Sequence, residues 1–458
     1  DRSGRRWALA RLARARGRRW RLRAVALELW FADAGHHADA FLAFRSQRDR
    51  QWFWADLQKQ HLPLIGPGDL TLDSRDAFKA GRVTEEWRRR RLSNFEYLMH
   101  LNLSAGRSYN DLTQYPVFPW VLADYEGEEE PDLDDPKSFR DLSKPMGALD
   151  SGRLQLFRER YQHFEDPHVP KFMYGSHYSS AGVVLHYLLR TEPYSGLAVE
   201  FQGTGRFDCP DRLFFDVAKA WRGASGASRN MSDVKELIPE FYCMPEIFLN
   251  SNDLPLGELQ DGMGSVGDVV LPRWARGPHH FVSVMRRALE SEHVSERLHH
   301  WVDLVFGYKQ RGEAAVAADN VFYYLTYEGA IDIDAITDPM LREATEAQIA
   351  HFGQTPAQLL RKPHPARLPP QECARPLCAD VAGLRDLRAY APPKQFGRPS
   401  WGPVLKVAVL GDATLATVHA DLSVSLLAWR PAPDGQGRPF TARPLRSRQA
   451  AAAALSLG

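Results

Sequence analysis

The segment from Asn110 to Tyr125, NDLTQYPVFPWVLADY, constrains the fold more than any other part of the chain. It is almost entirely apolar or aromatic, so it is expected to be buried. Pro116 and Pro119 lack backbone N–H groups and rule out both a helix interior and a central strand. The chain must therefore bury an irregular extended segment, and side chains must satisfy its main-chain polar groups.

Composition narrows the class of protein. Of the 458 residues, 44% are hydrophobic and 25% are charged, and the formal net charge is +1. These values are typical of a globular protein with two or three domains, and they give no global field for nucleic acid. The longest uncharged run, residues 172–189, contains two His and three Ser and is expected to be buried rather than membrane-spanning. Four Cys in so long a chain suit a reducing cytosol.

The two ends of the chain differ from its middle. Residues 1–24 contain ten Arg and one acid, which predicts a solvated basic face, with a transit peptide as the alternative. Residues 25–44 predict a two-stranded hairpin, and residues 45–60 predict a helix. Residues 404–429 alternate in polarity and predict three or so strands. Because the chain starts without Met, it is expected to be a fragment of a longer protein.

Between the two ends, short helices are expected to alternate with Pro-rich extended pieces. A capping box at residues 93–96 predicts a helix that ends near Gly106. Apolar residues predict a buried helix over residues 182–189, a second helix that starts near Pro210, and a third over residues 294–305. The acidic run 126–135 predicts an exposed loop.

His177 is a candidate catalytic base because it lies among Ser176, Ser179 and Ser180. No G-x-S-x-G motif surrounds these serines, so a buried, hydrogen-bonded His is favoured over a Ser–His pair. The neighbouring His pairs elsewhere lack metal-ligand spacing with any Cys, and the sequence predicts no metal site.

Three carboxylates, Glu236, Glu240 and Glu246, lie among aromatic residues and prolines, which is typical of glycosidases. Pairing with nearby Arg is the favoured structural alternative. The motif GMGSVG, residues 262–267, lacks the strand and helix that a dinucleotide site needs, so no cofactor is predicted.

Eight segments occur in the order seen in BEACH domains, and residues 84–367 resemble that whole domain. The segments are LSNFEYLMHLN, AGRSYNDLTQYPVFPWVLADY, FRDLSKPMGA, YGSHYSSAG, SDVKELIPEFYCMPEIFLNSN, GDVVLPRWA, WVDLVFGYKQRG and FYYLTYEG. The resemblance is to proteins of the neurobeachin and lysosomal-trafficking-regulator type. Residues 1–62 resemble the C-terminal part of the PH-like module that precedes BEACH. Residues 399–458 resemble the opening of a WD40 propeller, as one truncated or degraded blade, which leaves residues 63–83 and 368–398 as linkers.

This resemblance implies a multi-domain α+β chain. Its parts would be a β-rich PH-like remnant, a mainly α-helical BEACH domain with irregular extended core segments, and the start of a WD40 β-propeller. The PH-like part would pack on BEACH near residues 93–102 through ion pairs, with a groove between them.

The function that the resemblance implies is a non-enzymatic scaffold in vesicle trafficking, lysosome-related organelles or autophagy. Its partners would be other proteins of the trafficking machinery, with no nucleic acid and no cofactor. It would be cytoplasmic and peripherally associated with intracellular membranes. Two alternatives stay open: a hydrolase or lipid-modifying enzyme that uses His177 or Glu240, and a membrane-lipid binding module. In the second, the Arg-rich start would attract anionic membranes by charge alone.

Polar residues embedded in apolar motifs are the candidate interaction residues, although satisfying the polar groups of the core is the favoured role for them. They are Asn94, Glu96, Arg107, Asn110, Asp111, Lys144, His177, Lys235, Glu236, Glu240, Asn250, Asn252 and Lys309, with Gln114 and Ser143 as further core candidates.

Overall fold

The computed structural model describes residues 6–32, 39–66, 68–228, 230–260, 262 and 264–373, together with strands between residues 404 and 444. These residues form two compact units. The first covers residues 1–88 and 92–367, and the second covers residues 89–91 and 368–458.

A small sheet begins the first unit, with strand order β3-β2-β1-β4. Its strands are β1 (Leu12–Trp20), β2 (Arg23–Phe31), β3 (Ala40–Ala43) and β4 (Leu70–Thr71). The predicted hairpin is the antiparallel β2–β3 pair, and the predicted helix is α1 (Gln47–Gln58), which is capped by Ser46. Gly17 lets β1 approach the chain after β4, because a Cβ there would lie 2.1 Å from the carbonyl oxygen of Leu72.

The Arg-rich start is a paired strand, and the expectation of a solvated basic face holds only in part, because Arg6, Arg11 and Arg14 are exposed and Arg18 is buried. The side chain of Arg18 is fully buried and forms an ion pair with Glu28 at 2.6 Å. Arg19, Arg21 and Arg23 form ion pairs with acidic residues between residues 328 and 346. The alternation of a strand turns part of this basic run inward, where each buried charge needs a partner.

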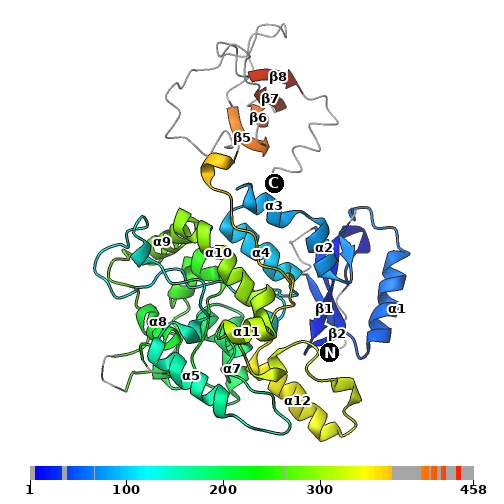
Figure 1. Cartoon of the computed structure of the whole chain (residues 1–458). Coiled ribbons are helices and arrows are strands. Elements are labelled where there is room, and N and C mark those ends of the chain that lie inside the picture. The colour runs from blue at the N-terminus through cyan, green and yellow to red at the C-terminus, as the bar shows by residue number, and fades with distance from the viewer. Residues whose placement is uncertain are drawn as a thin grey trace. The chain divides into compact units, whose positions relative to one another are not determined.

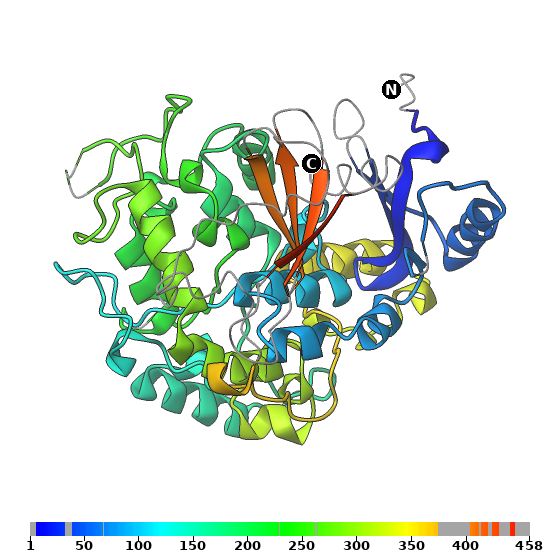
Figure 2. The same ribbon diagram turned by 90° about the horizontal axis from the view of Figure 1, so that it is seen from above.

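Helices and extended segments make up the rest of the first unit, and the small sheet with α1 lies to one side of them in both ribbon views (Figures 1 and 2). The helices are α2 (Ser74–Ala80), α3 (Val83–Arg88), α4 (Asn94–Ser104), α5 (Ser151–His163), α6 (Ala181–Leu188), α7 (Tyr194–Gln202), α8 (Val217–Ser225), α9 (Pro278–Glu290), α10 (Glu292–Val305), α11 (Glu313–Ala317) and α12 (Pro339–Phe352).

The helix signals in the sequence were accurate where a cap supported them. The capping box of α4 is present, with Ser93 and Glu96 bonded to each other's backbone N–H groups. The helix expected to start near Pro210 begins instead at Val217, because Pro210 opens only a short 3-10 turn and Asp216 caps α8. An apolar stripe alone does not locate the first residue of a helix, which here follows the Asp216 cap.

The aromatic segment 110–125 is an irregular core segment outside any sheet, with a short 3-10 turn at Leu112–Gln114. Its regular pairing is limited to single bridges, Phe118 with Leu237 and Leu122 with Phe139. Besides these bridges and the backbone bonds of its first turn, side chains supply further hydrogen bonds to its backbone. The amide of Asn102 accepts from Val117 N at 2.8 Å and donates to its carbonyl at 2.9 Å.

The second unit contains an antiparallel sheet of β5 (Val404–Gly411), β6 (Thr414–His419), β7 (Val424–Trp429) and β8 (Phe440–Pro444), in that order. Three of these strands lie in the segment whose alternation predicted strands, and β8 was not predicted. Its likeness to a propeller blade stays a prediction, and most of the predicted linker 368–398 lies outside the described residues.

Candidate interaction groove

A groove of about 410 Å³ lies between β2 and α4, and we call it the β2–α4 groove. One wall comes from α4, and the other comes from β2 and the loop that follows α4. Its lining residues are Glu28, Trp30, Asp39, Phe95, Glu96, Met99, His100, Asn102, Leu103, Arg107, Ser108, Tyr109, Asn110 and Pro116.

A buried carboxylate, Glu28, organises the floor of the groove. It accepts hydrogen bonds from Arg18 Nε at 2.6 Å, from Asn110 Nδ2 at 2.8 Å and from the hydroxyl of Ser108. Arg18 also donates to the carbonyl of Leu103 at the end of α4, at 2.9 Å. The charge of Glu28 is therefore neutralised and fully hydrogen-bonded, which makes it a structural joint rather than a reactive group.

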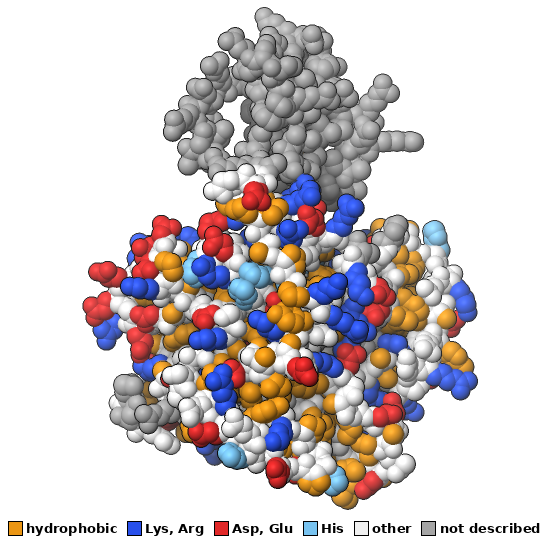
Figure 3. All heavy atoms as spheres, in the orientation of Figure 1, with side chains coloured by type: hydrophobic (Ala, Val, Ile, Leu, Met, Phe, Trp, Pro, Cys, Tyr) orange, Lys and Arg blue, Asp and Glu red, His pale blue; other side chains and the backbone are white. Residues whose placement is uncertain are grey.

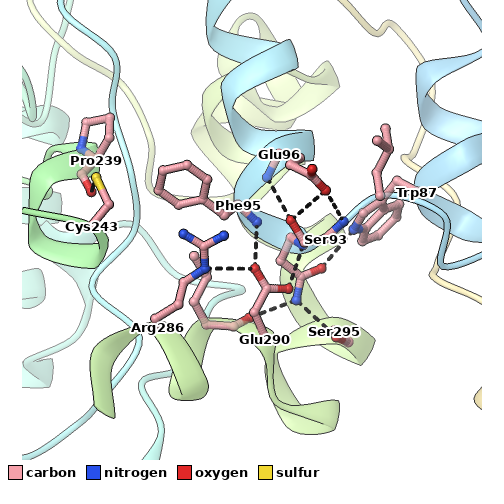
Figure 4. Close-up of polar contacts among 12 residues, drawn as sticks. Trp87, Ser93, Phe95, Glu96, Pro239, Cys243, Arg286, Glu290 and Ser295 are labelled. Carbon is pink, nitrogen blue, oxygen red and sulfur yellow. Dashed lines mark hydrogen bonds and ion pairs between the residues drawn. The ribbon is translucent and has the colours of Figure 1, made fainter. Parts of the chain in front are cut away.

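The α4 wall is held in place at its N-terminus by α9. Glu290 accepts from the backbone N–H groups of Asn94 and Phe95 at 2.7 and 3.0 Å. Arg286 lies 3.9 Å from the ring centroid of Phe95 and 3.5 Å from Glu290 (Figure 4). This carboxylate also complements the positive end of the helix dipole, so it stabilises the end of α4 that borders the groove.

Asn94 fixes the same end of α4 from inside the core. Its amide donates to Leu289 O at 2.7 Å and to Ser295 Oγ at 3.0 Å, and its oxygen accepts from Trp87 Nε1 at 2.8 Å. This predicted residue therefore serves packing and is turned away from the groove lining.

The chemistry of the groove is apolar with an acidic rim. Met99, Tyr109 and Trp30 form its apolar surface, and the Tyr109 hydroxyl donates to Met99 Sδ at 3.6 Å. Glu96 and Asp39 lie at the exposed rim. Such a site accommodates an apolar side chain with a cationic neighbour.

Arg107 forms the inner end of the groove and is 1% exposed. It donates to Tyr115 O and Gln354 O, each at 2.5 Å, and to Ser179 Oγ at 2.8 Å. Burial lowers the pKa of Arg107 to about 10. Its donors hold three separate segments together, so this predicted residue is a cross-link within the core.

Of the predicted residues, Glu96, Arg107 and Asn110 line the groove. Asp111 does not line it, and its carboxylate accepts hydrogen bonds from Thr113 N and Gln114 Nε2 within its own turn. Sequence reasoning missed the residues of the opposite wall, Glu28 and Trp30. They lie about sixty-five positions before α4, and no local pattern in the chain links the two.

His177 and Lys235 line a different cavity of about 400 Å³, together with Ser176, Ser180 and Asp233. The ring of His177 contacts Ser179 O at 2.9 Å through Nδ1 and Thr355 Oγ1 at 3.2 Å through Nε2. Burial lowers the pKa of His177 to about 3. Both nitrogens are thus engaged with groups other than a serine hydroxyl, which is the arrangement of a core histidine.

The two buried glutamates occupy separate environments. Arg140 holds Glu236 with two bonds of 2.7 and 2.8 Å, and Trp301 Nε1 donates to it at 2.9 Å. Glu240 accepts from the Tyr115 hydroxyl at 2.6 Å, and burial raises its pKa. Glu236 is a saturated ion pair, so it offers no free carboxylate for an acid–base pair.

The remaining predicted residues are scattered. Asn250 and Asn252 donate to the carbonyls of Leu254 and Arg190, and Lys144 lies on the surface 3.6 Å from Asp141. Lys309 lies over the ring of its neighbour Tyr308.

Among the residues that the structure describes, no cluster of three His, Cys, Asp or Glu could hold a metal ion. Within the same residues, no helix combines the length and apolarity needed to cross a bilayer.

Comparison with known proteins decides the family. The sequence matches the Beige/BEACH domain over residues 85–367. The chain belongs to the BEACH family. Its BEACH domain contains α4, the aromatic core segment and most of the β2–α4 groove.

Relatives from Arabidopsis thaliana extend this likeness beyond the domain. The chain is 47% identical over 436 residues to "BEACH domain-containing protein B", covering 93% of this chain and 16% of that protein. It is 49% identical over 373 residues to "BEACH domain-containing protein A2" and to "Protein SPIRRIG", covering 79% of this chain and 10% of each. The chain thus spans a small fraction of the length of these relatives.

Proposed function

We propose that this chain is a non-enzymatic scaffold whose β2–α4 groove binds a segment of a partner protein from the membrane-trafficking machinery. BEACH-domain proteins are generally regarded as trafficking scaffolds. The observation that carries the proposal is the groove itself, which combines an apolar wall with a floor whose charges are already paired. A site of this kind supplies contact area and shape, and it lacks an activated nucleophile or base.

The occupant that fits the groove is an extended or helical peptide with one large apolar side chain and a Lys or Arg beside it. Met99 and Tyr109 would contact the apolar side chain, and Glu96 at the rim would attract the cation. The hydrogen bonds that hold Glu28 and the end of α4 favour such binding, because walls that are already ordered lose little entropy when the partner arrives.

We further propose that the protein acts in the cytoplasm and reaches intracellular membranes peripherally, through its partners. Roles in vesicle transport, lysosome-related organelles or autophagy belong to this proposal. The paired state of Arg19, Arg21 and Arg23 leaves less free charge for direct attraction to anionic lipid than the sequence suggested. The engaged ring nitrogens of His177 give the hydrolase alternative no support.

The test compares two variants that carry the same substitution. Met99→Asp places a charge in the apolar wall, whereas Met340→Asp alters a side chain that is 80% exposed on α12. Proteins captured from a cell extract by the unaltered chain and by each variant would be quantified by mass spectrometry. We expect Met99→Asp to lose a set of trafficking proteins that Met340→Asp retains. Equal capture by all three proteins would refute the groove as the binding site.

A further inference from the structure

A further cavity in the first unit, of about 320 Å³, has no role in the proposed function. It lies between β1, the first turn of α1 and the end of α4, and we call it the arginine cavity. Its charged lining residues are Arg18, Arg19, Arg50, Arg75, Asp73 and Glu328. On the face shown in Figure 3, Lys and Arg side chains gather over the region of α2 and β1.

Both carboxylates of this lining are already occupied. Glu328 pairs with Arg19 at 2.7 Å, and Asp73 pairs with Arg75 through two bonds of 3.1 Å. Arg18 is engaged with Glu28, the buried glutamate of β2. The lining therefore has no acid left over for its fourth arginine.

That fourth arginine, Arg50, is 6% exposed. Within the described residues its guanidinium makes no hydrogen bond or ion pair, and its Nε is buried without an acceptor. Burial lowers the pKa of Arg50, with no nearby carboxylate to oppose the shift. Asp49, on the same turn, is exposed and bonded to Ser46. A buried charge without a counterion is costly, so the missing group is an anion.

We propose that the arginine cavity binds a phosphate-bearing anion, either a soluble phosphorylated polyol or the phosphorylated headgroup of a lipid. A guanidinium offers paired N–H donors whose spacing matches two phosphate oxygens. The first turn of α1 adds the positive end of a twelve-residue helix to the same wall. The cavity volume lies within the range of small-ligand sites, so there is space for more than a single phosphate group.

The experiment is titration calorimetry of the whole chain with inositol trisphosphate at physiological salt. A second arm measures binding to phosphatidylcholine vesicles that contain a phosphatidylinositol phosphate, or phosphatidylserine at matched charge. We expect Arg50→Met to weaken binding at least about tenfold, since it removes charged hydrogen bonds. Arg48→Met removes the same charge from the exposed side of α1 and should bind like the unaltered protein. Arg50→Lys keeps the charge without the paired donors and should give an intermediate affinity.

The two arms also identify the source of the ligand. Binding of the soluble ligand indicates a free metabolite, and binding to phosphoinositide vesicles alone indicates a lipid headgroup. Absence of saturable binding in both arms would overturn the proposal, and so would equal losses in Arg50→Met and Arg48→Met. Without ligand, Arg50→Met should melt at the same temperature as the unaltered protein or higher. A lower melting temperature would show that Arg50 has a structural role, which contradicts an empty anion site.

Discussion

Replacing Trp120 with alanine should remove much of the stability of the first unit. Trp120 is 0% exposed, and its ring centroid lies 5.1 Å from Tyr125, 5.3 Å from Trp221 and 5.8 Å from Phe241. Its indole N–H donates to Lys235 O at 3.1 Å. A buried Trp→Ala change costs about 3–5 kcal/mol through the cavity that it leaves. The abandoned carbonyl adds about 1 kcal/mol, giving a loss of about 4–6 kcal/mol.

Urea denaturation followed by far-ultraviolet circular dichroism would measure this loss. Trp52→Ala is the matched control, because Trp52 is 64% exposed on α1 and its removal should change the free energy of unfolding by less than about 1 kcal/mol. Trp120→Phe should fall between the two. If Trp120→Ala were as stable as Trp52→Ala, the buried aromatic segment would not stabilise the core, and the reasoning from its prolines and rings would fail.

Three further predictions concern buried ionisable residues. Arg140→Met should cost about 3–5 kcal/mol in urea denaturation because it strands Glu236, and adding Glu236→Leu should recover part of that loss; a double variant no more stable than the single one would contradict this. Because the folded pKa of His177 is about 3, below its unfolded value near 6.5, the unfolded chain binds more protons between these values. Lowering the pH from about 6 towards 3 should therefore reduce the free energy of unfolding by about 1.4 kcal/mol per pH unit through this residue, and His177→Gln should flatten the measured slope. Burial raises the pKa of Glu240, so its protonated form stabilises the fold at acid pH and this contribution declines as pH rises; Glu240→Gln should raise the melting temperature more at pH 8 than at pH 5.

The extended core segment shows how far local rules reach. Pro116 and Pro119 were enough to predict that the segment is buried, irregular and hydrogen-bonded by side chains. They could not show which side chains would do so. Asn102 accepts the hydrogen bond from Val117 N, and Glu236 accepts the one from Trp120 N. Glu236 lies 116 positions after Trp120 in the sequence.

The candidate sites show the same limit more strongly. The spacing of three residues between Ser93 and Glu96 predicted the start of α4, and this is a local signal. The groove beside α4 needs Glu28 from the small sheet, and the unpaired state of Arg50 depends on which carboxylates the other arginines have taken. A count of charges in the sequence cannot assign these partners.

The sequence by itself determined the family, the position of α4 and the burial of the aromatic segment, because each rests on residues close together in the chain or on long ordered motifs. Only the tertiary structure decided that the Arg-rich start is a strand with an inward-facing Arg18, that Glu28 and Trp30 form the wall of the groove opposite α4, and that Arg50 is buried without a partner. The physical reason is that burial and pairing of a charge depend on the groups packed around it, and those groups come from distant parts of the chain.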